Sequence, residues 1–95
     1  MAETKDAVRR DLLFHGRVQG VGFRYTTRDI ASRYTVTGYV QNLPDGRVRL
    51  VVEGAKPEVD RFIVAVTTEM AGYIHGQDEE ASRATGEFAN FSVRH

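Results

Sequence analysis

Cysteine is absent from this 95-residue chain. Without it the chain can form no disulfide, no thiolate nucleophile and no cysteine-ligated zinc site. Its 3 histidines, His15, His75 and His95, lack the spacing of metal ligands, and no carboxylate pattern accompanies them. We therefore expect a protein without a metal site.

An excess of either charge is also missing, because 13 basic residues balance 13 acidic ones. Non-specific nucleic-acid binding usually draws on surplus positive charge, so we expect no nucleic-acid partner. No apolar run approaches the ~18 residues of a membrane-spanning helix. The polar start of the chain, from Met1 to Asp6, also lacks the apolar centre of a signal peptide. These absences predict a cytoplasmic protein with no membrane partner.

The chain has the size and composition of one small domain. A hydrophobic share of 41% is typical of a soluble globular protein, and 95 residues leave no room for a second domain. We expect a flexible N-terminus at residues 1–7 and a single domain at residues 8–95. Nothing in the sequence demands more than a monomer.

Hydrophobic periodicity divides the chain into strands and helices. Alternation predicts strands at residues 8–16, 36–42, 47–53 and 88–93, and a helical period predicts helices near residues 23–34 and 57–70. We expect Gly54 to end the third strand. Residues 73–75 are read as a short strand and the polar residues 77–86 as a loop.

This order of elements predicts an α+β fold, the ferredoxin-like two-layer sandwich. Its βαββαβ pattern gives an antiparallel sheet with two helices on one face, and an extra C-terminal strand is left open. In this arrangement the first two strands run parallel with the third between them. Their carboxyl ends meet at one edge of the sheet, so the loop after Gly16 and the side chain of Asn42 are expected to be neighbours.

The loop between the first strand and the first helix contains Gly16, Gly20 and Gly22. Glycine permits a backbone nest of inward-pointing N–H groups, and the following helix aims its positive end at the same spot. Arg24 is unfavourable in that first turn unless an anion compensates its charge. The simpler alternative, a tight connection with an exposed arginine, is as good an explanation from the local pattern alone.

Two motifs resemble the signatures of the acylphosphatase family and lie at the expected separation. The first is Gly16-Arg17-Val18-Gln19-Gly20-Val21-Gly22-Phe23-Arg24, and the second is Gly38-Tyr39-Val40-Gln41-Asn42-Leu43-Pro44-Asp45-Gly46-Arg47-Val48. The resemblance extends over nearly the whole chain. It departs at the end, where Arg94-His95 stands in place of the family's usual aromatic residue, and over residues 71–80.

The resemblance implies the hydrolysis of acyl phosphates to a carboxylate and inorganic phosphate. Loop amides from Gly16 to Gly22, chiefly those of Arg17 to Val21, and the Arg24 guanidinium would hold the phosphate. Asn42 would orient the attacking water. The family implies no metal, no cofactor and no covalent intermediate, and the partner would be a small-molecule acyl phosphate.

Two other functions remain open at the level of sequence. A regulatory module of this fold would bind phosphate without hydrolysing an acyl phosphate. A carbamoyl-phosphate-handling module, as occurs within larger maturation enzymes, would use the same loop. RNA binding is disfavoured, because the predicted open face carries Leu13, His15, Arg49, Val51 and Glu53 rather than the aromatics that stack on bases.

Overall fold

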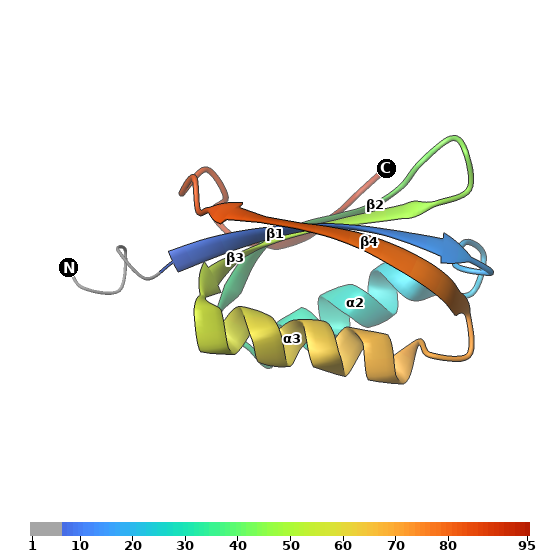
Figure 1. Ribbon diagram of the computed structural model, residues 1–95, viewed down its shortest axis with the longest axis horizontal. Coiled ribbons are helices and arrows are strands. Elements are labelled where there is room, and N and C mark those ends of the chain that lie inside the picture. The colour runs from blue at the N-terminus through green and yellow to red at the C-terminus, as the bar shows by residue number, and fades with distance from the viewer. Residues whose placement is uncertain (1–6) are drawn as a thin grey trace.

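The computed structural model describes residues 7–95 and contains two helices and five strands (Figure 1). In chain order they are β1 (Ala7–Gly16), α2 (Phe23–Ala31), β2 (Val36–Asn42), β3 (Val48–Ala55), α3 (Lys56–Glu69), β4 (Ile74–Arg83) and β5 (Phe91–Arg94). The flexible N-terminus predicted for residues 1–7 lies outside the described residues, except for Ala7. That residue begins β1, so the prediction is wrong there.

The strands form one sheet in the order β4-β1-β3-β2-β5. β3 lies antiparallel between β1 and β2, so β1 and β2 run in the same direction, as the split βαβ arrangement predicts. β4 pairs antiparallel with the other edge of β1, while β5 pairs parallel with β2. The ferredoxin-like prediction is confirmed and the extra C-terminal strand exists. The sheet is mixed rather than wholly antiparallel, because β5 runs in the direction of β2.

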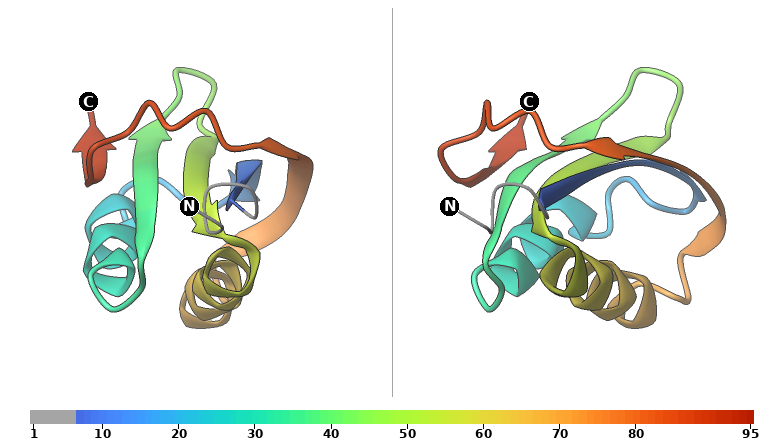
Figure 2. Two further views of the ribbon diagram at one scale, coloured as in Figure 1. Left: turned by 90° about the vertical axis from the view of Figure 1, so that its left-hand side faces the viewer. Right: turned by 60° about the vertical axis from the view of Figure 1, so that its left-hand side comes forward.

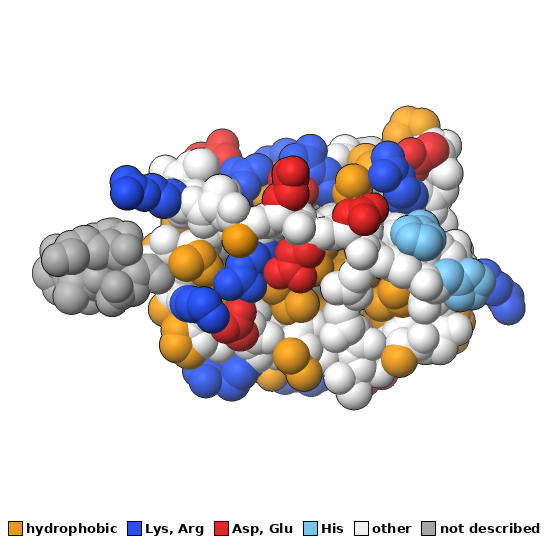
Figure 3. Space-filling model, in the orientation of Figure 1, with side chains coloured by type: hydrophobic (Ala, Val, Ile, Leu, Met, Phe, Trp, Pro, Cys, Tyr) orange, Lys and Arg blue, Asp and Glu red, His pale blue; other side chains and the backbone are white. Residues whose placement is uncertain are grey.

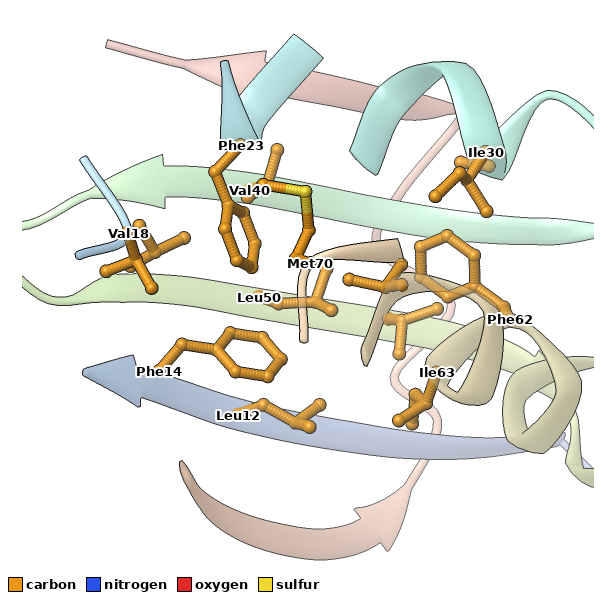
Figure 4. Packing of buried hydrophobic residues seen from close by; sticks show 14 of the residues in the cluster. Leu12, Phe14, Val18, Phe23, Ile30, Val40, Leu50, Phe62, Ile63 and Met70 are labelled. Carbon is orange, nitrogen blue, oxygen red and sulfur yellow. The ribbon is translucent and has the colours of Figure 1, made fainter. Parts of the chain in front are cut away.

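Both helices pack on one face of the sheet (Figures 1 and 2). The predicted apolar stripes point inward: Phe23, Thr27, Ile30 and Ala31 of α2 are buried, as are Val59, Phe62, Ile63 and Val66 of α3. They meet the inner residues of the central strands in a single core (Figure 4). The Phe62 ring contacts Tyr34 and Phe91, with ring centroids 6.1 and 5.5 Å apart, and so joins α3 to the end of α2 and to β5.

The loop predicted at residues 77–86 is wrong over residues 77–83, because β4 runs to Arg83, and only residues 84–86 lie outside a strand. Its side chains gave no strand signal, since residues 77–83 are exposed and mostly polar on both faces. Backbone pairing with β1 holds this strand at the edge of the sheet, where charged side chains are common. The predicted end of the third strand at Gly54 is also wrong, since β3 continues to Ala55.

Residues 84–90, here called the strap, cross the open face of the sheet from β4 to β5 (Figure 2). The Glu53 side chain, which is 3% exposed, accepts hydrogen bonds from the Thr85 N–H and hydroxyl and from the Gly86 N–H at 2.9 to 3.0 Å. The Phe88 ring lies on Tyr39, with centroids 5.8 Å apart. The strap therefore covers the face that an RNA-binding sheet would leave open.

Candidate active site

The loop between β1 and α2 begins with a close approach of two backbones. A Cβ atom on Gly16 would lie 2.5 Å from the Tyr73 carbonyl oxygen, so only glycine fits there. The next N–H, that of Arg17, donates to the same carbonyl at 2.9 Å. The Arg17 amide, which the sequence analysis included among the phosphate-binding amides, is therefore engaged within the protein in this structure.

Apolar contacts fix the loop at its middle and at both ends. Val18 is fully buried and anchors the loop in the core (Figure 4). Phe14 near the end of β1 and Phe23 at the start of α2 are packed together with ring centroids 5.2 Å apart. The loop is therefore held in place by side chains that are buried in the core.

Gly20 and Gly22 give the loop its shape. Their φ angles of 78° and 79° lie in the left-handed region, although a Cβ at either position would meet nothing within 4 Å. Glycine is needed here for backbone conformation and not for space. Among the described residues, no protein group accepts a hydrogen bond from the backbone N–H groups of residues 18–22. Gly22 is also the N-cap residue of α2, whose first turn contains no acidic residue.

Arg24 lies in that first turn and is half-buried. Its Nη1 donates to the Arg94 carbonyl oxygen at 3.4 Å and lies 3.1 Å from Nδ1 of His95. Within residues 7–95 no carboxylate forms an ion pair with Arg24. The cation therefore adds to the positive end of the helix instead of being neutralised.

Asn42 ends β2 beside this loop. Its Oδ1 is shut off from solvent, yet no described protein group donates a hydrogen bond to it. Buried polar atoms without a partner are rare in folded proteins, and this oxygen is one of three such side-chain atoms in the described residues, with Arg10 Nε and Thr27 Oγ1. Asn42 and Arg24 line one pocket of about 140 Å³ together with Val18, Gly20, Gly22, Phe23 and Tyr25. The structure thus brings together the two side chains singled out from the sequence.

The remaining residues of the β1–α2 loop differ in what they contact. Gly16 and Arg17 serve the contact with Tyr73, and Val21 is half-buried against the core. Gln19 does not line the pocket. Its Nε2 donates to the carbonyl oxygens of Leu43 and Arg47 at 2.8 and 2.9 Å, across to the turn between β2 and β3. Sequence patterns assigned Gln19 no such role, since a bond between two loops leaves no local pattern.

Larger hollows occur elsewhere on the molecule. One of about 500 Å³ lies between α2 and α3 over Ile30, Val64 and Ala65. The charged residues around it are mostly paired within the protein: Asp60 with Arg10 and Lys56, Arg33 with Asp29, and Arg61 with Glu58. The smaller pocket is the better candidate because, within the part of the chain that is described, its arginine has no carboxylate partner, its loop N–H groups have no protein acceptor and its amide oxygen has no protein donor.

Ion pairing explains most other charges of the surface, where basic and acidic side chains are interspersed (Figure 3). Near the pocket, the Arg47 guanidinium donates to Asp45 at 2.9 Å, and this hydrogen bond lowers the pKa of that carboxyl group. On the open face the hydrogen bond from Arg49 lowers the pKa of Asp11 in the same way. Arg24 is the contrasting case, a half-buried guanidinium with no such partner among residues 7–95.

Two negative findings complete the description of residues 7–95. No group of three or more His, Cys, Asp or Glu side chains comes together in a way that could hold a metal ion. Neither described helix combines the length and the apolar character that a membrane crossing requires.

The fold and the pocket define a two-layer α+β domain with unpaired donors gathered at one end of its sheet. The family model of acylphosphatase matches residues 10–93. An acylphosphatase of Paenarthrobacter aurescens is 38% identical over 91 residues, which cover 95% of this chain and 97% of the relative. The chain therefore belongs to the acylphosphatase family.

Three further comparisons concern length and shape. An acylphosphatase of Trichormus variabilis is 54% identical over 56 residues, 59% of this chain, and the match spans only 55% of that relative. The crystal structure of acylphosphatase from Bacillus subtilis superposes with a TM-score of 0.83 at 29% identity, covering 93% of this chain and 99% of that one. Full-length HypF in its phosphate- and nucleotide-bound form matches with a TM-score of 0.79 at 26% identity over 94% of this chain but 12% of its own.

Proposed function

We propose that this chain hydrolyses acyl phosphates, and that the pocket between the β1–α2 loop and Asn42 is its active site. One observation carries the proposal. A single pocket is lined by a guanidinium without a carboxylate partner, by loop residues whose backbone N–H groups have no described protein acceptor, and by an amide whose buried oxygen has no described protein donor. An anion and a water molecule are the two partners that these groups match.

The phosphate of the substrate would occupy the loop. N–H groups from Val18 onward and the Arg24 guanidinium would donate to its non-bridging oxygens and offset the charge that spreads over them during transfer. Such donors act without reorganisation, because Val18, Phe14 and Phe23 already fix the backbone. The family resemblance supports this assignment by placing Arg24 and the loop in its first signature.

Asn42 would orient the attacking water. A carboxamide cannot take up a proton in this role, so its contribution is position: Oδ1 accepts one water hydrogen and aims the oxygen at phosphorus. The new O–P bond forms as the bond from phosphorus to the acyl oxygen breaks, the electron pair leaves with the carboxylate, and both protons of the water end on the phosphate product. A carboxylate is a good leaving group, so the reaction needs no strong general acid and no residue that is covalently modified.

The test is phosphate release from a simple aryl acyl phosphate with EDTA present, for the wild type, Arg24→Ala and Asn42→Ala. Loss of one positioned donor in such a site costs ~3–4 kcal/mol, or a rate reduction of about a hundred- to a thousandfold. Arg28→Ala is the matched control for charge, since Arg28 is an exposed arginine of the same helix that does not line the pocket. It should retain the wild-type rate.

Hydrolysis in ¹⁸O-labelled water identifies whether the P–O bond or the C–O bond of the substrate breaks. We expect the label in phosphate and not in the carboxylate. Label in the carboxylate, or equal rates for the wild type and both variants, would refute the assignment. If the protein binds inorganic phosphate but leaves the acyl phosphate intact, the alternative of a binding module is correct.

A further inference from the structure

The side chain of Gln19 connects the two halves of the pocket. It leaves the β1–α2 loop and ends on the turn that follows Asn42, where its Nε2 donates to the carbonyl oxygens of Leu43 and Arg47 at 2.8 and 2.9 Å. The two halves come from different connections of the chain, 24 to 28 residues apart in sequence. Both hydrogens of one amide are therefore used to join them.

The two carbonyls belong to the residues that close this turn. Leu43 N–H donates to the Arg47 oxygen at 2.8 Å, and Gly46 N–H donates to the Leu43 oxygen at 3.1 Å. With Gln19 added, each oxygen accepts two hydrogen bonds, which is its full capacity. Gln19 thus binds a turn that is already closed, so its effect is to fix where the turn lies relative to the loop.

Position matters here because Asn42 directly precedes Leu43 and is the last residue of β2. Beyond Asn42 the turn is exposed to solvent at Pro44, Asp45 and Gly46, so burial of these residues does not fix its position. We propose that Gln19 is a positioning residue that sets the distance between Asn42 and the phosphate-binding loop. This inference rests on the proposed function, since it concerns the aim of the water that Asn42 orients.

Removal of the Gln19 amide should reduce turnover without weakening phosphate binding. A misplacement of about 1 Å in an aligned site costs up to about a hundredfold in rate, so we expect kcat to fall about 10- to 100-fold in Gln19→Ala. The loop amides and Arg24 are unchanged, so KM and the inhibition constant of inorganic phosphate should stay within about twofold. The fold should persist, because each carbonyl keeps its backbone donor.

Two further variants and one control separate position from stability. Gln19→Glu keeps the shape but turns an acceptor toward two carbonyl oxygens, and Gln19→Asn withdraws the donors by one methylene. Both should show the same loss of kcat, and either one decides the question if Gln19→Ala does not fold. Gln41→Ala removes the carboxamide next to Asn42 that forms no side-chain hydrogen bond within residues 7–95, and it should retain wild-type kcat.

The decisive measurement is a double-mutant cycle with Asn42→Ala. If Gln19 acts through Asn42, Gln19→Ala should change kcat by less than about threefold once Asn42 is gone. Equal losses in both backgrounds, a weaker inhibition by phosphate, or an unchanged kcat in Gln19→Ala would each overturn the inference. No hydrolysis by the wild-type protein would instead overturn the proposed function, so the two failures are distinguishable.

Discussion

The strap and the β1–α2 loop both contain backbone N–H groups outside the regular strands and helices, and the protein pairs those groups in opposite ways. At the strap, the buried carboxylate of Glu53 accepts from Thr85 and Gly86. At the β1–α2 loop, no described protein group accepts from residues 18–22, and the charge nearby is the cation Arg24. The strap thus has an anionic side chain as its acceptor, whereas the β1–α2 loop has none among the described residues.

The strap with Glu53 has the character of a structural contact, whereas the β1–α2 loop has that of the proposed binding site. Donors saturated by Glu53 hold the strap on the sheet and gain nothing from a ligand. Donors at the loop have no such protein acceptor among the described residues, and the proposed function gives them the phosphate of the substrate, next to Arg24 and the start of α2. We therefore expect substitutions at the loop to change activity and substitutions at Glu53 to change stability.

The largest expected effect is that of Arg24→Ala on activity. If the loop and Arg24 bind the phosphate of the substrate, kcat/KM of Arg24→Ala for an acyl phosphate should fall about a thousandfold or more. This corresponds to a loss of ~4 kcal/mol of transition-state stabilisation. The free energy of unfolding in urea should stay within about 0.5 kcal/mol of wild type, because a cation at a helix N-terminus does not stabilise the helix. A loss of several kcal/mol in stability would show that Arg24 is a structural residue, and the loop would then not differ from the strap in this respect.

Glu53→Gln should show the reverse pattern. Hydrogen bonds to a charged group contribute about 1.5 to 3 kcal/mol, and the neutral amide introduced at this position would either turn its own donors toward Thr85 and Gly86 or accept from them without the charge. We expect the free energy of unfolding to fall by about 2 to 3 kcal/mol and kcat to remain unchanged. Chemical denaturation followed by circular dichroism measures the first, and phosphate release measures the second. A variant that keeps its stability but loses turnover would show that the strap serves the active site.

The pH dependence of stability sharpens the same comparison. Burial opposes the ionisation of Glu53, but hydrogen bonds from Thr85 and Gly86 and the charge of Arg9 outweigh it and lower its pKa below the ordinary value of 4.5. The folded state therefore holds this proton less tightly than the unfolded state, so the contribution is complete above the unfolded pKa and disappears as pH falls through the folded one.

We expect the stability difference between the wild type and Glu53→Gln to be constant near neutral pH and to shrink below about pH 5. Urea denaturation over a series of buffers from neutral to acidic pH measures it. Asp11, whose pKa is lowered by its hydrogen bond with Arg49, titrates in both proteins and contributes to both curves. A stability difference between the two proteins that grows toward low pH would contradict the lowered pKa of Glu53.

Sequence patterns sufficed where burial imposed a period. The stripes of α2 and α3, the β2–β3 hairpin and the convergence of the loop with Asn42 follow from apolar spacing and from strand direction. They failed at β4, whose polar residues 77–83 are paired through the backbone alone. The contacts of Gln19 and Glu53 were also missed, because a side chain that bonds a distant segment leaves no periodic trace in the sequence.

The smallest expected effect concerns the shape of the loop itself. Gly20→Ala forces a side chain into the left-handed region at φ 78° in open space, so its cost is purely conformational, about 1 kcal/mol of stability. Gly72→Ala is the matched control, since a Cβ there also meets nothing within 4 Å and no left-handed φ is required. It should be neutral or stabilising by about 0.4 to 1 kcal/mol. Because the nest at Gly20 would relax toward an ordinary turn, inhibition by inorganic phosphate should weaken in Gly20→Ala and not in Gly72→Ala. Equal behaviour of the two variants would mean that the loop's conformation is unrelated to anion binding.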